Sequence, residues 1–160
     1  MEMIPLPHTT VAKIVGLLKV LDEHAGREDI YKLAKELHYE LGELMEVIKA
    51  GEMLGFVHTP GGDAVLEDLG KTILKSKVNT KKKLFRDQLK KVALMTRLIQ
   101  MLYRAEDHRL DKEAVLEELS RLLPHEDPEK TFETLVNWSR YGELFGYTRG
   151  SQQLYLDHAE

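Results

Sequence analysis

The sequence predicts an α+β fold that is mainly α with short β-hairpins, with tandem winged-helix-like modules joined by a long basic helix. Apolar residues recur at helical spacing through most of the 160 residues, two strand-turn-strand segments follow helices, and one short motif occurs twice. We place the first module at residues 1–78 and the long helix with the second module at residues 79–160, and we expect them to pack as one unit.

The first half contains three predicted helices and a hairpin. Thr9 or Thr10 can cap the first helix, whose apolar positions repeat until Gly26. Further helices are predicted over 30–37 and from about residue 41 to Gly55. A hairpin follows over 56–67, with turn residues at 60–63. This order of elements is typical of a winged-helix module.

The second half repeats this order behind a long helix. Apolar residues over 80–103 recur at spacings of three and four, which predicts one continuous helix capped by Thr80. Asp111 can cap the next helix, and Asp127 with Pro128 begins the last one. A second hairpin is predicted over 147–156 around the turn residue Gly150.

Residues 50–56 and 141–147 share one pattern: Gly, Glu, two apolar residues, Gly and an aromatic residue. We expect residues 41–67 and 130–157 to superpose as helix plus hairpin, with Gly55 on Gly146 and Phe56 on Tyr147. Both Gly55 and Gly146 are predicted to take positive φ where the helix ends and the chain reverses.

The charge is concentrated in the middle of the chain. The net charge is −4, but residues 71–91 hold nine lysines and arginines against one acid, Asp87, a net +8 that leaves −12 for the rest. There is no cysteine, no signal-peptide pattern and no apolar run that could span a membrane. We therefore expect a cytoplasmic protein without a membrane span.

The basic residues of the long helix are candidates for an interaction surface. At 100° per residue Lys83, Arg86 and Lys90 share one stripe, while Phe85 and Leu89 lie on another that faces the core. Two interpretations remain open, a solvated face and a docking site for an acidic protein surface. The candidate interaction residues are Lys81, Lys82, Lys83, Arg86, Lys90 and Lys91.

Several other functions are disfavoured by the residues themselves. The third helix of each module is net acidic, which argues against reading duplex DNA with it. His108 and His125 each stand beside two acids, but adjacent residues seldom bind one ion. No phosphate-binding loop or nucleophile motif occurs. We expect no enzyme activity, catalytic residue, cofactor or metal.

Four segments carry a family resemblance: 26–34, 54–56, 83–85 and above all 138–147. In them the chain resembles the AAA-associated domain at the carboxyl end of ATP-binding subunits of nitrate, sulfonate and taurine-type ABC importers, here without the ATPase. Ser139 and Gly142 depart from the usual glycine and alanine of that family. The family-signature residues are Trp138, Arg140, Tyr141, Glu143, Leu144 and Phe145.

The resemblance implies a regulatory domain and supplies no catalytic residues. The implied partner is a protein, either an ABC transporter ATPase subunit or a second copy of this chain, and nucleic acid is not expected. The alternative is a winged-helix nucleic-acid-binding transcriptional regulator that uses the basic central segment.

Overall fold

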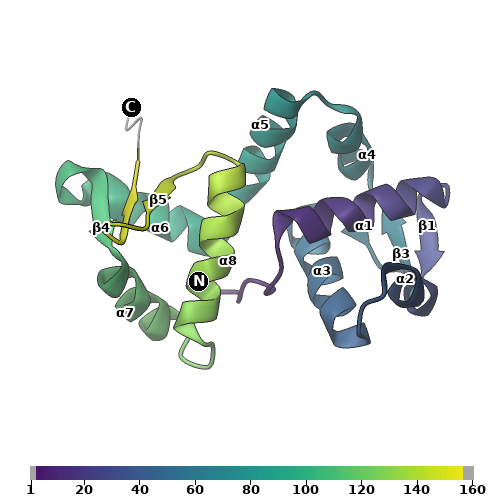
Figure 1. The fold of residues 1–160 in the computed structure, drawn as a ribbon, viewed down its shortest axis with the longest axis horizontal. Coiled ribbons are helices and arrows are strands. Elements are labelled where there is room, and N and C mark those ends of the chain that lie inside the picture. The colour runs from purple at the N-terminus through teal and green to yellow at the C-terminus, as the bar shows by residue number, and fades with distance from the viewer. Residues whose placement is uncertain (1–2, 157–160) are drawn as a thin grey trace. The chain divides into compact units, whose positions relative to one another are not determined.

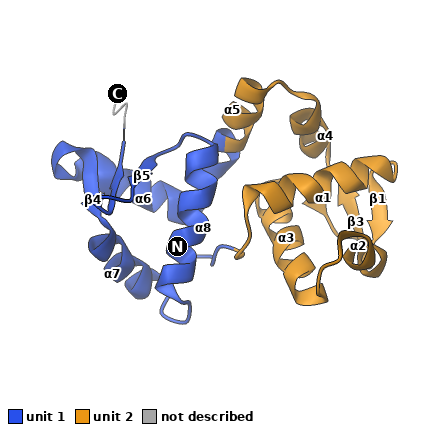
Figure 2. Ribbon diagram, in the orientation of Figure 1, with its two compact units in different colours: residues 1–6, 86–160 blue, residues 7–85 orange. Residues whose placement is uncertain are grey.

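A computed structural model of the protein describes residues 3–156. The chain forms two units (Figure 2): unit 2 is residues 7–85, and unit 1 is residues 1–6 with 86–160. The boundary lies inside the fifth helix, whereas the sequence-based division at residue 78 falls at the start of that helix. Residues 1–2 and 157–160 of the predicted modules, and residue 157 of the predicted repeat, lie outside the described residues.

The predicted α+β class with a majority of helix is confirmed (Figure 1). The elements of unit 2, up to the helix that crosses the boundary, are α1 (Val11–Glu23), β1 (Arg27–Asp29), α2 (Ile30–Leu37), α3 (Leu41–Met53), β2 (Val57–His58), β3 (Asp63–Leu66), α4 (Asp68–Lys75) and α5 (Val78–Leu89). The remaining elements belong to unit 1: α6 (Ala93–Arg104), the 3₁₀ turn η1 (Glu106–His108), β4 (Arg109–Asp111), α7 (Lys112–Leu122), α8 (Pro128–Tyr141), β5 (Gly146–Thr148) and β6 (Gln153–Tyr155).

Side-chain caps begin several helices where the sequence places them. The hydroxyl of Thr10 accepts a hydrogen bond from the amide of Lys13, and the carboxylate of Asp127 accepts from the amides of Glu129 and Lys130. Asp111 also stands at the N-cap of α7, but its carboxylate accepts from the Gln153 side chain instead. The Thr10 and Asp127 caps satisfy amides that have no partner inside the helix.

The single long helix predicted over 80–103 is wrong. The helix α5 begins at Val78 and ends at Leu89, and Val92, with φ −80 and ψ 122, is the extended N-cap residue of α6. The Thr96 hydroxyl donates to the carbonyl of Lys90 at 2.9 Å, which helps satisfy the interrupted backbone. Leu89 and Val92 are both buried. The apolar pattern continues across the break, so periodicity alone does not reveal it.

Each hairpin pairs with a third strand that the sequence analysis missed. The antiparallel strand orders are β1-β3-β2 and β4-β6-β5. Strand β1 consists of Arg27, Glu28 and Asp29, so it has no apolar alternation by which a strand is usually recognised. Both units therefore have the order helix, strand, helix, helix, strand, strand, and the predicted repetition of helix plus hairpin is confirmed.

The predicted alignment of the two repeats is wrong. In unit 2 the amide of Phe56 donates to the carbonyl of Gly51 at 2.8 Å, and Gly55 has φ 81. This is the expected left-handed helix end. In unit 1 the corresponding bond runs from the amide of Leu144 to the carbonyl of Ser139 at 2.9 Å.

The residue of unit 1 with positive φ at this helix end is Glu143, with φ 55, whereas Gly146 belongs to β5 and has no positive φ. Glu143 therefore corresponds to Gly55. Strand register agrees, because His58 pairs with Val65 as Gly146 pairs with Tyr155. The seven-residue sequence match is displaced by three residues from the structural correspondence, so it aligns residues that have different roles.

Candidate functional site: a basic cavity in unit 1

A cavity of about 530 Å³ lies in unit 1, within the size range of small-molecule sites. It is bounded by the end of α5, the carboxyl half of α6, the turn after α8, and the end of β6. The lining residues are Arg86, Lys90, Ile99, Tyr103, Arg140, Glu143, Leu144, Phe145, Gly146, Tyr155 and Leu156.

The cavity brings together two sets of residues that the sequence analysis treated separately. Arg86 and Lys90 come from the basic segment. The other set comes from the family signature and consists of Arg140, Glu143, Leu144 and Phe145. Sequence analysis missed the wall formed by Ile99, Tyr103, Tyr155 and Leu156, because the first two have the spacing of core positions in the long helix and the last two are hairpin residues.

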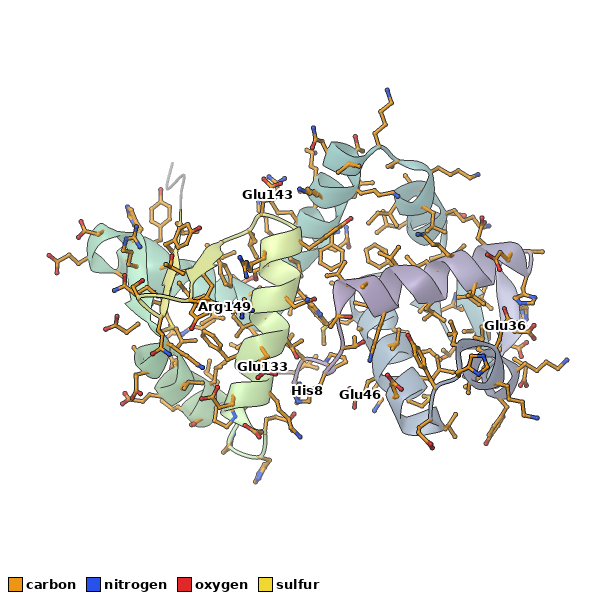
Figure 3. The ribbon with its side chains drawn as sticks, viewed as in Figure 1. His8, Glu36, Glu46, Glu133, Glu143 and Arg149 are labelled. Atoms are coloured by element: carbon orange, nitrogen blue, oxygen red, sulfur yellow. The ribbon has the colours of Figure 1, made fainter. Side chains whose placement is uncertain are left out.

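The turn after α8 supplies Glu143, Leu144 and Phe145 to one side of the cavity. Glu143 lies beyond the last turn of α8 in a left-handed conformation, so it does not share a helical face with Arg140 (Figure 3). Phe145 follows and is buried. Trp138 is fully buried and belongs to the core, Tyr141 is half-buried, and neither lines the cavity.

Gly146 permits Tyr155 to form a wall. A Cβ atom at Gly146 would overlap the ring of Tyr155, whose hydroxyl oxygen would lie only 2.5 Å from it. The guanidinium of Arg109 lies 5.4 Å from the centre of the same ring. The close approach, rather than an unusual backbone angle, therefore accounts for the glycine in β5.

The cavity has an excess of positive charge. Arg86, Lys90 and Arg140 face a single carboxylate, that of Glu143, which also has other interactions. The Nε atom of Arg86 is inaccessible to solvent and has no hydrogen-bond partner among the described residues. A buried donor without a partner costs about 1–3 kcal/mol, and because a water-sized oxygen cannot reach this atom, the cost falls on the folded protein itself.

The other basic candidates have different surroundings. Lys83, Lys90 and Lys91 are exposed, while Lys81 and Lys82 are half-buried. Arg86 is also half-buried, although it shares a stripe with the exposed Lys83 and Lys90. Lysines 81–83 and 91 do not line the cavity.

A histidine between two carboxylates lies in unit 2. Nδ1 of His24 is 3.3 Å from a carboxylate oxygen of Glu28, and Nε2 is 2.8 Å from one of Glu36. Within residues 3–156 this is the group of side chains whose ligand atoms come close enough to hold a metal, and it includes neither His108 nor His125. Because each ring nitrogen faces its own carboxylate, the geometry is that of a hydrogen-bonded bridge.

An ion pair of unit 1 that perturbs a pKa lies outside the cavity. Arg121 donates to one carboxylate oxygen of Glu118 at 2.5 Å, and Arg97 donates to the other at 2.7 Å. These bonds, led by that from Arg121, lower the pKa of Glu118 although partial burial opposes them. The arrangement fixes α6 against α7 and has the character of a structural ion pair.

The comparisons with known proteins give one family. No curated protein and no solved structure matches the chain. In the described part of the chain, no helix combines the length and apolar character needed to cross a bilayer. The model of the C-terminal AAA-associated domain matches residues 31–148, which include α2 through β5. This match confirms the resemblance found in the sequence, and the chain belongs to the C-terminal AAA-associated domain family.

Proposed function

We propose that the chain is a non-catalytic regulatory domain that docks on an acidic surface of an ABC transport ATPase. The proposal places the domain in the cytoplasm, where such ATPases hydrolyse ATP. The family match over residues 31–148 supports the accessory role. The observation that carries the docking mode is the exposed side chain of Val78 among lysines. It lies at the corner between α4 and α5, whose backbone is drawn in Figure 1.

This corner surface consists of Lys75, Lys77, Val78 and Lys81. Lys75 and Lys77 are exposed, and Val78 is 67% exposed. An apolar side chain with a basic rim matches the usual arrangement of protein interfaces, in which charges at the rim select the partner. Arg86 and Lys90, which line the cavity, are not needed for this contact.

The position of the lysines also argues against a purely stabilising role. Lys81 and the lysines that follow it lie near the start of α5, where positive charge opposes the helix dipole. The rest of the chain is acidic, so solubility does not require a basic cluster here. An acidic partner surface would offset this unfavourable interaction at Lys81.

Binding to a purified nitrate-, sulfonate- or taurine-type ABC ATPase tests the proposal. We expect salt-sensitive association by surface plasmon resonance, and a changed ATPase rate when the chain is added. Replacement of Lys75, Lys77 and Lys81 by glutamate should weaken binding at least about tenfold, because the rim of the surface then repels an acidic partner. A matched control replaces the exposed Lys19, Lys32 and Lys49 with glutamate, and its affinity should stay within about twofold.

Equal loss of binding in both triple variants would reject the corner surface. Self-association of the chain with the same salt dependence would identify a second copy as the partner instead. Tight, salt-sensitive binding of a short DNA duplex in a gel-shift assay would favour the nucleic-acid-binding alternative.

The non-catalytic part of the proposal has its own test. The chain has no phosphate-binding loop, so the isolated protein should neither bind ATP tightly nor hydrolyse it. Turnover above a purified blank that is abolished by a substitution in this chain would contradict this.

A further inference from the structure

We propose that the cavity of unit 1 binds a small organic anion, with its charged group against Arg86, Lys90 and Arg140 and an apolar body on the aromatic wall. This site is independent of the docking surface at the corner of α4 and α5. Its test uses the isolated chain and no ATPase, so failure of one proposal leaves the other standing.

The charge around the cavity selects an anion. Three cationic side chains and one carboxylate line it. Arg86 lines the cavity and is half-buried, so its guanidinium is a charged donor group for a carboxylate, sulfonate or phosphate oxygen. Arg140 and Lys90 are exposed and can reach the same group from the rim. The carboxylate of Glu143 disfavours ligands that carry many negative charges.

The remaining wall selects an apolar body. Ile99, Leu144 and Phe145 line the cavity together with the ring of Tyr155, and Tyr103, 48% exposed, lies at its edge. Aromatic and aliphatic walls with a few directed polar groups are typical of small-molecule sites. An inorganic anion would satisfy the cations and leave this apolar surface in contact with water.

The surface that lines the cavity has a counterpart in unit 2. In unit 2, α4 packs on α1 and lies so close to the hairpin that a Cβ at Gly70 would be 2.5 Å from the carbonyl oxygen of Phe56 and 2.7 Å from Leu66. The corresponding elements of unit 1 are α6, Leu144 and Leu156, and all of them line the cavity. The open volume is the counterpart of the surface that α4 covers in unit 2.

Titration of the ¹⁵N-labelled chain with 2-naphthoate and octanoate tests the site. We expect saturable shifts of the amide signals of Ile99, Leu144 and Gly146. The neutral isostere 2-naphthamide should bind at least about tenfold more weakly, because it lacks the charge. Inorganic phosphate should also bind more weakly than 2-naphthoate, because it has no apolar body.

Arg140→Gln and Lys90→Gln should each weaken 2-naphthoate binding about tenfold. The matched control is Arg149→Gln, an exposed arginine of the same unit that does not line the cavity, and its affinity should be unchanged (Figure 3). Arg86→Met should give the largest loss, with circular dichroism to verify its fold. If Arg86→Met does not fold, the affinities of Arg140→Gln and Lys90→Gln for 2-naphthoate decide the test.

Three results would overturn the proposal. The first is no amide shift with either probe up to about 10 mM, a concentration at which even weak sites bind. The second is equal affinity for 2-naphthoate and 2-naphthamide. The third is the same affinity in Arg140→Gln, Lys90→Gln and Arg149→Gln.

Discussion

The ends of α3 in unit 2 and α8 in unit 1 have the same hydrogen-bond pattern but place their glycines differently. Gly55 supplies the left-handed residue of unit 2, whereas Glu143 takes that conformation in unit 1. Gly142 of unit 1 corresponds to Leu54, and Gly146 corresponds to His58. Two glycines at the same spacing in sequence can therefore have unrelated causes, one a backbone angle and the other a close neighbour.

The neighbours of each hairpin account for this difference. In unit 2, α4 packs against the hairpin at Gly70. In unit 1 the ring of Tyr155 lies over Gly146, and the end of α5 lies against Gly142. Gly70, Gly142 and Gly146 thus lie where a neighbouring element comes close, and those elements differ between the units. Substitutions at corresponding positions should separate the two causes.

The largest expected effect comes from comparing Gly70 with Gly146. Gly70→Ala should lower the free energy of unfolding by about 3 kcal/mol, because the new Cβ meets a backbone carbonyl that cannot move without displacing α4. Gly146→Ala should cost only about 1 kcal/mol, because the half-buried ring of Tyr155 can turn aside. Urea denaturation of both variants measures the difference. Equal costs would show that the ring is as fixed as the backbone.

The second comparison is between an ion pair in each unit. The side chain of Glu118 in unit 1 is only 10% exposed, whereas Lys13 and Glu43 in unit 2 are 41% and 38% exposed at 2.6 Å. Glu118→Gln should therefore cost about 2 kcal/mol, because it weakens two charged hydrogen bonds around a mostly buried group. Glu43→Gln should cost at most about 0.5 kcal/mol, because exposed pairs contribute little. Urea denaturation of the two variants measures both costs.

The same pair gives a pH dependence. The pKa of Glu118 lies below its ordinary value of 4.5 in the folded protein, so its stabilisation is present above that value. It is lost as the pH falls through the lowered folded-state pKa. The wild type should lose more stability than Glu118→Gln between neutral pH and pH of about 3. Acid unfolding of the two proteins is followed by circular dichroism. An equal loss of stability in the wild type and in Glu118→Gln would contradict the lowered pKa of Glu118.

The third comparison reverses the sign of the effect at the corresponding helix ends. Gly55→Val should destabilise by about 1–2 kcal/mol, because a β-branched residue tolerates φ 81 poorly. Glu143→Gly should stabilise by up to about 1 kcal/mol, because it relieves a non-glycine residue at φ 55. Thermal melts of both variants, compared with the wild type, measure the sign of each change in stability. Destabilisation by Glu143→Gly would mean that its side chain contributes more than the backbone strain costs.

Sequence analysis predicted the parts of the fold that depend on local patterns. The cap at Thr10, the Asp127 start of α8 and the two hairpins follow from residues close together in the chain. The break after Leu89 escaped prediction, because Leu89 and Val92 keep the apolar periodicity. Strand β1 escaped because its three charged residues pair only with a strand far along the chain.

The cavity depends on tertiary contacts and was predicted only in pieces. Lys90 and Arg140 were both candidates, but for different reasons, and nothing in their spacing indicates that they line one cavity. Tyr155 comes after the hairpin turn and has the pattern of an ordinary strand residue. Its role became visible only through its contact with Gly146. The sequence match that aligned Gly55 with Gly146 concealed this contact.

The smallest expected effect is at Gly142, where the two units differ most in side-chain size. Leu54 fills the corresponding place in unit 2 and is buried, but in unit 1 a Cβ at position 142 would already lie 3.2 Å from Cδ1 of Leu89 and 3.4 Å from backbone atoms of Arg86. Gly142 has φ −76 and ψ −4, which alanine adopts without strain. Gly142→Ala therefore lowers the conformational entropy of the unfolded chain, which stabilises the fold by about 0.4–1 kcal/mol.

Crowding against α5 opposes that gain by a similar amount, because the Leu89 methyl can shift by a few tenths of an ångström while the backbone of Arg86 resists. The net change in the free energy of unfolding should be within about 0.5 kcal/mol of zero. Gly142→Leu, which copies unit 2, cannot be accommodated in this way and should be strongly destabilising. Urea denaturation of both variants tests the argument. A well-folded Gly142→Leu protein would show that the end of α5 does not pack against α8 as the structure has it.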